Sequence, residues 1–462
     1  MKERIVDVLR KDPSDELIAI EGWVRTKRDS KNVCFLEVND GSSLKGIQIV
    51  FDKNTFSDLA TLNNVTTGSA VICEGTLVAS GGGGQSVELA ASALTLVGEC
   101  PTDTYPLQKK RHTLEYLREI AHLRVRTNTF GAVARVRNTL AWATHKFFQD
   151  KNFLYVNTPI ISSSDAEGAG EMFRVTTLDL LNVPKTEDGQ VDYTKDFFGK
   201  QTFLTVSGQL EGETYALALK NIYTFGPTFR AENSNTKRHL SEFWMIEPEM
   251  AFCDIHGNMA LAEEYVKYLF SEVLRKNEED MEFFSRHYEA EMGTTLQKII
   301  ETPFIRLTYT DAVKELAKKN DTFEFPVSWG TDLQSEHEKY LTEVVFKSPV
   351  IVTDYPKEIK AFYMKLNDDE KTVRGMDVLV PRLGEIIGGS EREANPEILE
   401  SRMRALKLNP EDYWWYLDLR RFGSVPHSGF GLGFERAVQY VTGMGNIRDV
   451  IPYPRSPKSA EF

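Results

Sequence analysis

A guanidinium and a carboxylate stand two residues apart in the segment from residue 222 to residue 247. The segment has the pattern of two strands joined by a polar loop, and the pair is Arg230 and Glu232. On a strand, residues two apart point to the same face, where a guanidinium can hold a phosphate and a carboxylate can accept from an amine. A surface ion pair would give the same spacing, so this segment alone leaves both interpretations open.

A second candidate is a glycine-rich segment that ends in an arginine, at residues 428–436. We expect a strand at 416–419 before it and a helix at 437–441 after it. Glycines at a strand-to-helix junction let a ligand approach the backbone, and a helix N-terminus favours phosphate. Arg436 stands where the dinucleotide-binding fingerprint would need glycine, and no βαβ unit surrounds it, which excludes a Rossmann domain. An arginine in that place suits the polyphosphate of ATP.

The third candidate is Glu385, which is followed by two consecutive glycines, Gly388 and Gly389. Magnesium in proteins favours a few carboxylates together with phosphate oxygens, so this glutamate could hold Mg²⁺ between the phosphates of a nucleotide. A bulged edge strand would explain the same glycines without any ligand. Alone, the segment does not decide between the two interpretations.

The elements that must position these residues follow from hydrophobic periodicity. Apolar side chains recur at helical spacing through residues 128–150, and a strand at 153–156 then leads to Pro159. The rest of the chain mixes strands with amphipathic helices and has no fixed-period repeat, so we expect an α+β domain built on an antiparallel sheet flanked by helices. Residues 182–200, with a proline and several charges, predict a polar surface insertion.

Residues 18–98 predict a small closed β-barrel, because short strand patterns follow one another between turn-forming separators. Among small barrels, the OB-fold is the one that habitually presents a face to single-stranded nucleic acid. We therefore expect an N-terminal OB-fold domain at 1–100, a linker at 101–127 and the α+β domain at 128–462.

Composition limits the classes of protein that this chain can be. At 462 residues, with 41% hydrophobic and 27% charged residues, it is long enough for two or three globular domains. The formal charge of −13 argues against general binding of polyanions, so any nucleic-acid site must be local. Two basic clusters qualify, although both could be solvated faces: Arg25, Lys27, Arg28 and Lys31, and Lys109, Lys110, Arg111, Arg118, Arg124 and Arg126.

We expect a cytoplasmic protein. The N-terminus has charged residues where a secretory signal needs an uninterrupted apolar core, and no stretch reaches membrane-spanning length. The four cysteines are widely separated, with neither the spacing of zinc ligands nor that of a disulfide framework, which suits a reducing compartment.

Taken together, the candidate segments resemble the signature motifs of class II aminoacyl-tRNA synthetases. The order is the same: a helix and strand ending at Pro159, the hairpin that bears Arg230, and the glycine-rich junction that bears Arg436. The N-terminal barrel resembles the anticodon-binding domain of the aspartyl, asparaginyl and lysyl branch. Because three motifs occur in this order and the resemblance spans nearly the whole chain, it is specific.

The resemblance implies that the carboxylate of an amino acid attacks the α-phosphorus of ATP in line, and that the 3′ end of a tRNA then accepts the amino acid. Positioning and charge neutralisation suffice for such a reaction, so no residue need act as a nucleophile or strong base. Arg230 and Arg436 would be the catalytic residues. The side chains implied to bind ATP are Arg230 (α-phosphate), Glu232 (adenine amine), Phe243 (adenine ring), His239 and Arg436 (outer phosphates) and Glu385 (through Mg²⁺).

The amino acid implied is L-asparagine, as in the bacterial-type asparaginyl members of the family. Where aspartyl enzymes carry a lysine that meets the substrate carboxylate, this chain has Gly212, and where they carry an aspartate it has Glu247. Losing the cation removes the partner of a substrate carboxylate, while a retained carboxylate can accept from an amide NH₂. The side chains implied to bind the amino acid are Glu167 (ammonium), Ser207, Gln209, Glu247 and Arg392 (amide oxygen), with Tyr363 and Lys365 lining the same pocket.

The resemblance also implies the macromolecular partners, tRNA(Asn) and a second copy of the chain. In the barrel, Arg28 would meet the anticodon backbone, Phe35 would stack on the central base and Gln48 would hydrogen-bond to it. Phe35 could equally be a core residue, since only one of Cys34 and Phe35 can point inward. The helix before Pro159 lies where the family builds its dimer interface, so we expect a twofold homodimer.

Two alternatives stay open. One is an aspartyl or non-discriminating enzyme, which ATP–pyrophosphate exchange with each amino acid would separate from an asparaginyl one. The other is a synthetase-like paralogue that binds RNA or a metabolite without charging tRNA. Its usual mark is the loss of Arg230 or Arg436, and this chain has both.

Overall fold

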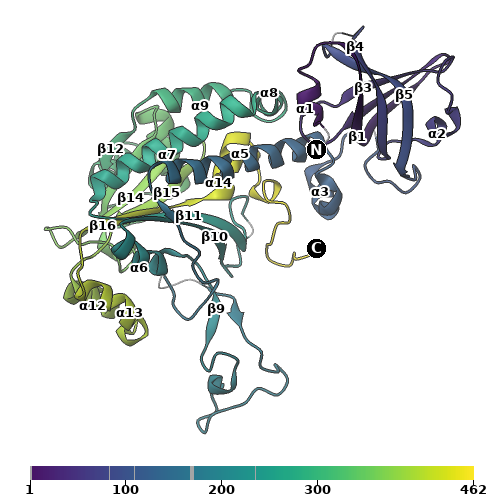
Figure 1. Ribbon diagram of the computed structural model, residues 1–462. Coiled ribbons are helices and arrows are strands. Elements are labelled where there is room, and N and C mark those ends of the chain that lie inside the picture. Colours follow the sequence, from purple (N-terminus) through teal and green to yellow (C-terminus); the bar gives the residue numbers. More distant parts are fainter. Residues whose placement is uncertain (1–2, 83, 109, 167–170, 235) are drawn as a thin grey trace. The chain divides into compact units, whose positions relative to one another are not determined.

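The computed structural model in Figure 1 describes residues 3–82, 84–108, 110–166, 171–234 and 236–462. The chain divides into two units, Met1–Arg135 and Val136–Phe462. The division falls inside one long helix, α5 (Asn128–Asp150), and each unit has apolar core clusters of its own.

The first unit contains a closed barrel of five strands in the order β1-β2-β3-β5-β4, as the spacing of short strand patterns predicts. Alternation along β2 decides which side chains fill it: Cys34, Leu36 and Val38 are fully buried, while Phe35 lies half-buried on the other face. The strands are β1 (Ser14–Asp29), β2 (Val33–Asn39), β3 (Ile47–Asp52), β4 (Ala70–Ala79) and β5 (Val87–Gly98).

Residues 101–127, expected as a linker, contain two short helices. Leu107, Leu117 and Phe130 pack together there in a small apolar cluster, so the segment has structure of its own. The helices of the first unit that precede α5 are α1 (Ile5–Val8), α2 (Leu59–Asn64), α3 (Leu114–Glu119) and α4 (Ala121–Arg124).

The second unit is built on an eight-stranded sheet in the order β12-β13-β14-β15-β16-β11-β10-β6. Its six central strands are antiparallel, which confirms the prediction, while the two edge strands pair in parallel and make the sheet mixed. The strands are β6 (Leu154–Tyr155), β10 (Asn221–Phe229), β11 (Glu242–Ala251), β12 (Ile305–Thr308), β13 (Val350–Pro356), β14 (Thr372–Val380), β15 (Gly384–Glu391) and β16 (His427–Gly433).

Helices cover both faces of this sheet, with α6 and α7 on opposite sides in Figure 1. The predicted apolar positions of α5 are buried, among them Val136, Leu140 and Phe147. The helices that follow α5 are α6 (Gln209–Leu219), α7 (Ile255–Lys276), α8 (Glu278–His287), α9 (Met292–Glu301), α10 (Tyr309–Ala317), α11 (Ser335–Lys339), α12 (Pro396–Ala405), α13 (Trp414–Arg421) and α14 (Phe434–Thr442).

The strand expected at residues 416–419 is wrong, because these residues lie in α13. Tyr416, Leu417 and Arg420 are all buried, and that spacing is the one by which a helix, not a strand, turns one face to a core. The aromatic and aliphatic residues of this stretch favour a strand locally, and packing against the core overrides that preference.

The expected surface insertion at 182–200 lies between two strands of a small separate sheet. This sheet has the order β7-β9-β8, with β7 (Ile161–Ser162), β8 (Arg174–Val175) and β9 (Thr202–Leu204). The segment is exposed along most of its length. It is less polar than expected, since Phe197 within it is 75% exposed and Leu181 just before it is 92% exposed.

Candidate active site

Three segments that are far apart in the chain meet around one pocket of the second unit. They are the hairpin of β10 and β11, the start of β15, and the junction between β16 and α14. The pocket has an empty volume of about 830 Å³. All six side chains expected to bind ATP line it: Arg230, Glu232, His239, Phe243, Glu385 and Arg436.

Arg230 enters this pocket from the first residue after β10, not from the strand itself as predicted. Its backbone N–H donates to the carbonyl of Ser241 at 3.0 Å, which extends the hairpin beyond the strand. The guanidinium carbon lies 5.4 Å from the ring centroid of Phe243, so the arginine and the aromatic ring share one wall. Glu232 lies in the loop that follows β10. It lines the pocket as predicted, but not because residues two apart on a strand share a face.

Arg436 and Glu385 face each other across the pocket lining. Arg436 comes from the first turn of α14, and its Nη1 lies 3.6 Å from Glu385 Oε2 and donates to the Glu385 carbonyl at 3.3 Å. The two side chains are 31% and 40% exposed, so both are open to a ligand. Since β15 has a partner strand on each side, the edge-strand interpretation of Glu385 is wrong.

His239 lies in the loop of the hairpin, where two hydroxyl groups hold its ring. Its Nδ1 is 2.8 Å from Ser234 Oγ and 2.7 Å from Thr236 Oγ1. Burial lowers the pKa of His239, and the neighbouring arginines lower it further while Glu232 opposes them. Negative charge from an arriving polyphosphate would act in the other direction and favour the protonated ring.

A second carboxylate, Asp377, lies beside Glu385 and was not predicted. Asp377 on β14 pairs with Gly388 on β15. A Cβ atom on Gly388 would lie 3.1 Å from Glu385 Oε1 and 3.6 Å from Asp377 Oδ1, so both carboxylates face one spot. Lys360 Nζ, 2.7 Å from Asp377 Oδ2, balances part of their charge. Asp377 is brought to this place by the pairing of β14 with β15, and the sequence alone does not show which strands pair.

These two carboxylates fit a magnesium ion. Mg²⁺ is usually bound by one or two carboxylates plus phosphate oxygens, not by a cage made wholly of protein. Among the residues that the structure describes, no group of three or more His, Cys, Asp or Glu side chains forms a metal-binding cluster. The donor set is therefore of the kind that would bind the metal together with a nucleotide.

A second pocket adjoins the first and shares Arg230, Met245, Glu385 and Gly431 with it. The two pockets therefore adjoin at these four residues. The side chains in the described ranges that were expected to bind the amino acid also line the second pocket: Ser207, Gln209, Glu247 and Arg392.

Three further expectations for the second pocket have different outcomes. Tyr363 lines the pocket. Lys365 is not among the lining residues, because its ammonium lies 2.7 Å from Glu391 Oε1 in a separate ion pair. Glu167 lies outside the described residues.

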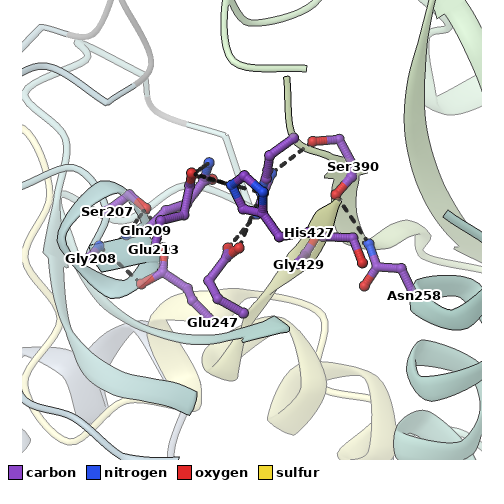
Figure 2. Close-up of polar contacts among 12 residues, drawn as sticks. Ser207, Gly208, Gln209, Glu213, Glu247, Asn258, Ser390, His427 and Gly429 are labelled. Carbon is purple, nitrogen blue, oxygen red and sulfur yellow. Dashed lines mark hydrogen bonds and ion pairs between the residues drawn. The ribbon is translucent and has the colours of Figure 1, made fainter. Parts of the chain in front are cut away.

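Glu247 is held in one orientation by three donors before any ligand arrives (Figure 2). The backbone N–H of Gly208 donates to its Oε2 at 3.0 Å, Thr224 Oγ1 donates to the same oxygen at 2.9 Å, and Ser207 Oγ donates to Oε1. The residue is only 5% exposed. A carboxylate has about four acceptor sites, so one remains for a ligand N–H.

Arg392 forms the floor of the second pocket and is already paired. Its Nε and Nη2 donate to the two carboxylate oxygens of Glu249, and its Nη1 donates to Ser390 Oγ at 2.8 Å. Burial raises the pKa of Glu249, and the guanidinium opposes this. Gly429 leaves the room for this pair, since a Cβ there would overlap the Glu249 carboxylate.

A second buried carboxylate, Glu213 on α6, lies below the same floor and was not predicted. Arg420 Nη2 donates to its Oε2 at 2.7 Å, and Tyr416 Oη lies 2.8 Å from both oxygens. His427 Nε2 is 3.1 Å from Oε2, and Gln209 Nε2 donates to Oε1 at 3.1 Å (Figure 2). Glu213 thus fixes the amide of a pocket residue.

In the first unit, the residues expected to read an anticodon line one pocket on the outer face of the barrel. Arg28 Nη2 donates to Gln48 Oε1 at 2.7 Å, and the Arg28 guanidinium carbon lies 5.3 Å from the ring centroid of Phe35. Gln48 Nε2 donates in turn to Glu88 Oε2 at 2.9 Å. Because Phe35 lines this pocket and Cys34 fills the interior, the core interpretation of Phe35 is wrong.

No helix in the described part of the chain combines the length and the apolar character that crossing a bilayer requires.

Comparison with known families gives two matches that together cover most of the chain. Residues 113–457 match the family described as tRNA synthetases class II (D, K and N), and residues 18–97 match the OB-fold nucleic acid binding domain. The second match covers the closed five-stranded barrel, so the barrel is an OB-fold.

Individual relatives are similar over their full lengths. The chain is 60% identical to the asparagine-tRNA ligase of a Nostoc species over 462 residues, covering 100% of both chains. It is 61% identical to that of Treponema denticola over 469 residues, covering 99% of each. Among solved structures, the asparaginyl-tRNA synthetase from Pyrococcus horikoshii complexed with asparaginyl-adenylate is 33% identical, with a TM-score of 0.83 and 96% of each chain covered.

Proposed function

The chain belongs to the class II aminoacyl-tRNA synthetases of the aspartyl, lysyl and asparaginyl group, and from this premise we propose that it is an asparagine-tRNA ligase. It activates L-asparagine with ATP and transfers it to tRNA(Asn). The observation that carries the proposal is that two pockets adjoin: Arg230, Glu385 and Arg436 line the first, and Arg230 and Glu385 also line the second.

In the first pocket, we propose that the side chains act by neutralising charge on ATP and by holding ATP in position. We assign Arg230 to the α-phosphate, because it lines both pockets and so lies where the amino acid and the nucleotide meet. Phe243 stacks on the adenine ring, Glu232 accepts from its amine, and His239 and Arg436 hold the outer phosphates. Fixed guanidinium groups that meet developing negative charge need no reorganisation during the reaction, which is how positioning alone accelerates phosphoryl chemistry.

Glu385 and Asp377 would hold a Mg²⁺ ion where the two pockets adjoin. When bound, the metal supplies neutralisation of phosphate charge. Lys360 Nζ lies 2.7 Å from Asp377 Oδ2. Its positive charge reduces the repulsion between the two carboxylates when no metal is bound.

In the second pocket, Glu247 accepts from the side-chain amide of asparagine and Arg392 donates to its carbonyl oxygen. Ser207 orients Glu247, and Gln209 closes the floor beside it. Glu167 would neutralise the ammonium group of the substrate. Gly212 supplies no cation where an aspartyl enzyme would have one, so a substrate carboxylate has no dedicated partner.

Recognition of the tRNA is assigned to the barrel. We propose that Arg28 meets the anticodon backbone and that Phe35 and Gln48 bind the central base. The pocket on the outer face supports this, because it places an aromatic ring, a guanidinium and an amide together. We assign residues 1–100 to the anticodon domain, 101–127 to the linker and 128–462 to the catalytic domain.

We also propose that the enzyme is a cytoplasmic homodimer. Apolar side chains on and after β6 support a dimer interface there, since Leu154, Tyr155, Ile160 and Ile161 are 40–51% exposed. Sedimentation equilibrium tests this directly, and a protein that stays monomeric at micromolar concentration would refute it.

The experiment that tests the function is ATP–pyrophosphate exchange with asparagine and with aspartate, followed by charging of tRNA(Asn). We expect exchange and charging with asparagine. Exchange with aspartate alone would identify an aspartyl enzyme. Comparable exchange with both amino acids would identify a non-discriminating enzyme. No exchange with either amino acid would identify a paralogue that does not charge tRNA.

A further inference from the structure

Four charged side chains lie below the second pocket in a group that we call the buried charge network: Arg392, Arg420, Glu213 and Glu249. All four are at most 2% exposed. Arg392 contacts both oxygens of Glu249, and its Nε lies 3.9 Å from Glu213 Oε1. Arg420 pairs with Glu213 at 2.7 Å. With both carboxylates ionised, two positive and two negative charges balance in a volume from which water is excluded. Burial raises the pKa of Glu249, and its two hydrogen bonds from Arg392 oppose that rise.

Only one member of the network, Arg392, lines the second pocket. Its contacts with Glu249 and Ser390 use three of its five N–H groups and leave two for a substrate oxygen. A substrate side chain therefore meets the network as a hydrogen-bond donor. Whether it also meets a net positive charge depends on the carboxylates behind the arginine.

Glu213 is ionised in this environment. Burial alone would raise the pKa of Glu213, but Arg420, His427 and Arg392 hold it well below its usual range. Its charge is therefore present throughout the neutral pH range. With Glu249 on the other side, Arg392 has a carboxylate near each flank.

This balance has opposite consequences for the two related amino acids. An asparagine side chain is neutral and needs only donors and acceptors, which Arg392 and Glu247 supply. An aspartate side chain adds a negative charge next to Glu247, with no unbalanced cation in the network to offset it. In a buried site an uncompensated charge is strongly disfavoured.

We propose that Glu213 is a specificity-determining residue, which neutralises Arg392 from below so that the pocket accepts a side-chain amide and rejects a carboxylate. The inference rests on the proposed function and extends it, because Glu213 lies outside the pocket lining and acts through Arg392 and Gln209. It also explains why a second arginine, Arg420, is buried here: Arg420 keeps Glu213 charged.

The test is the ratio of kcat/KM for asparagine to kcat/KM for aspartate in ATP–pyrophosphate exchange. We expect Glu213→Gln to lower this ratio at least tenfold, because Arg392 then has a positive charge to share with aspartate. The double variant Glu213→Gln/Arg420→Gln removes one charge of each sign and is expected to restore most of the discrimination. A merely structural role for Glu213 predicts the opposite, since the double variant loses more contacts.

A control variant separates charge from packing. Tyr416→Phe removes a hydrogen bond to Glu213 without changing any charge. It is expected to keep the wild-type ratio. If Glu213→Gln does not fold, Glu249→Gln changes the charge on the other flank of Arg392 and should lower the ratio likewise.

A folded Glu213→Gln or Glu249→Gln variant with the wild-type ratio would overturn the inference. So would a double variant that is less selective than the single one. Failure of the proposed function looks different, because it appears in the wild-type protein as absent exchange with asparagine.

Discussion

The nucleotide pocket and the amino-acid pocket adjoin, but their ion pairs are buried to very different degrees. In the nucleotide pocket, the side chains of Arg436 and Glu385 are 31% and 40% exposed and lie 3.6 Å apart. Under the amino-acid pocket, those of Arg392 and Glu249 are 2% and 1% exposed and make two direct hydrogen bonds. One pair is open to a ligand, and the other is already satisfied.

The difference reflects what each pocket must do. A polyphosphate is highly charged, so binding it requires cations that a ligand can still reach, and the partly exposed Arg436 meets that requirement. Distinguishing an amide from a carboxylate requires donors and acceptors that do not rearrange to suit the wrong ligand. Burial and multiple partners supply that rigidity at Glu247 and Arg392.

The largest expected effect is at Arg230, one of the four residues that line both pockets. Arg230→Ala should lower kcat/KM for ATP–pyrophosphate exchange by about 10³-fold or more, because it removes a charge that meets the reacting phosphate. Circular dichroism and thermal unfolding should show an intact fold. Activity within tenfold of wild type would place the reacting phosphate elsewhere and break the comparison between the pockets.

Substituting methionine for Arg392 and, separately, for Arg436 measures how burial changes the contribution of each arginine to stability. Arg392→Met leaves Glu249 buried without its partner and should lower the free energy of unfolding by about 3–5 kcal/mol. Arg436→Met disturbs an exposed pair and should cost about 1 kcal/mol or less while still impairing ATP binding. Urea unfolding of both variants gives the two values, and equal losses would contradict the comparison.

A variant in the barrel sharpens the comparison by leaving both pockets intact. Phe35→Ala removes the ring on which we expect a base to stack, a contact worth roughly 1–3 kcal/mol. Charging of tRNA(Asn) should therefore fall by about 10- to 100-fold, with exchange unchanged. If exchange fell equally, the assignment of the barrel to tRNA recognition would be wrong.

The smallest expected effect concerns Glu338 on α11, which is only partly exposed beside the nucleotide pocket and accepts from the backbone N–H of Glu385 at 3.2 Å. Burial raises the pKa of Glu338 to about 7, and the charge of Glu385 adds to this. A raised carboxyl pKa contributes stability that is complete below the unfolded-state value and is lost as pH rises through 7.

Glu338→Gln should therefore remove part of the pH dependence of unfolding. Near pH 4 the variant and the wild type should have similar stability, and near pH 8 the variant should be more stable by roughly 1–2 kcal/mol. Urea midpoints from pH 4 to pH 8 test this. A constant difference across that range would show that Glu338 does not titrate as described.

The order of the motifs was enough to predict that Arg230, Glu385 and Arg436 would meet, because resemblance to a family carries information about folding over long distances. Local reasoning was weaker at the ends of elements. Arg230 was placed on a strand that ends one residue earlier, and residues 416–419 were predicted as a strand although packing makes them helical.

Contacts made below the pocket surfaces were not predictable from the sequence. Asp377 lies beside Glu385 through the pairing of β14 with β15, and strand register follows from the whole sheet. The carboxylate of Glu213 meets side chains from α13 and from the start of β16, each of them about two hundred residues away in the chain. No local pattern marks such a meeting.

Gly429 has a consequence for how this protein can change over generations. A mutation there to any other amino acid puts a carbon atom where the Glu249 carboxylate lies, and so disturbs Arg392, which lines the second pocket. Substitution at Gly429 is tolerable only together with a smaller residue at 249, and that pair of changes abandons the anchor. Inheritance of a glycine at this position is therefore tied to the glutamate at 249, even though Gly429 lines neither pocket.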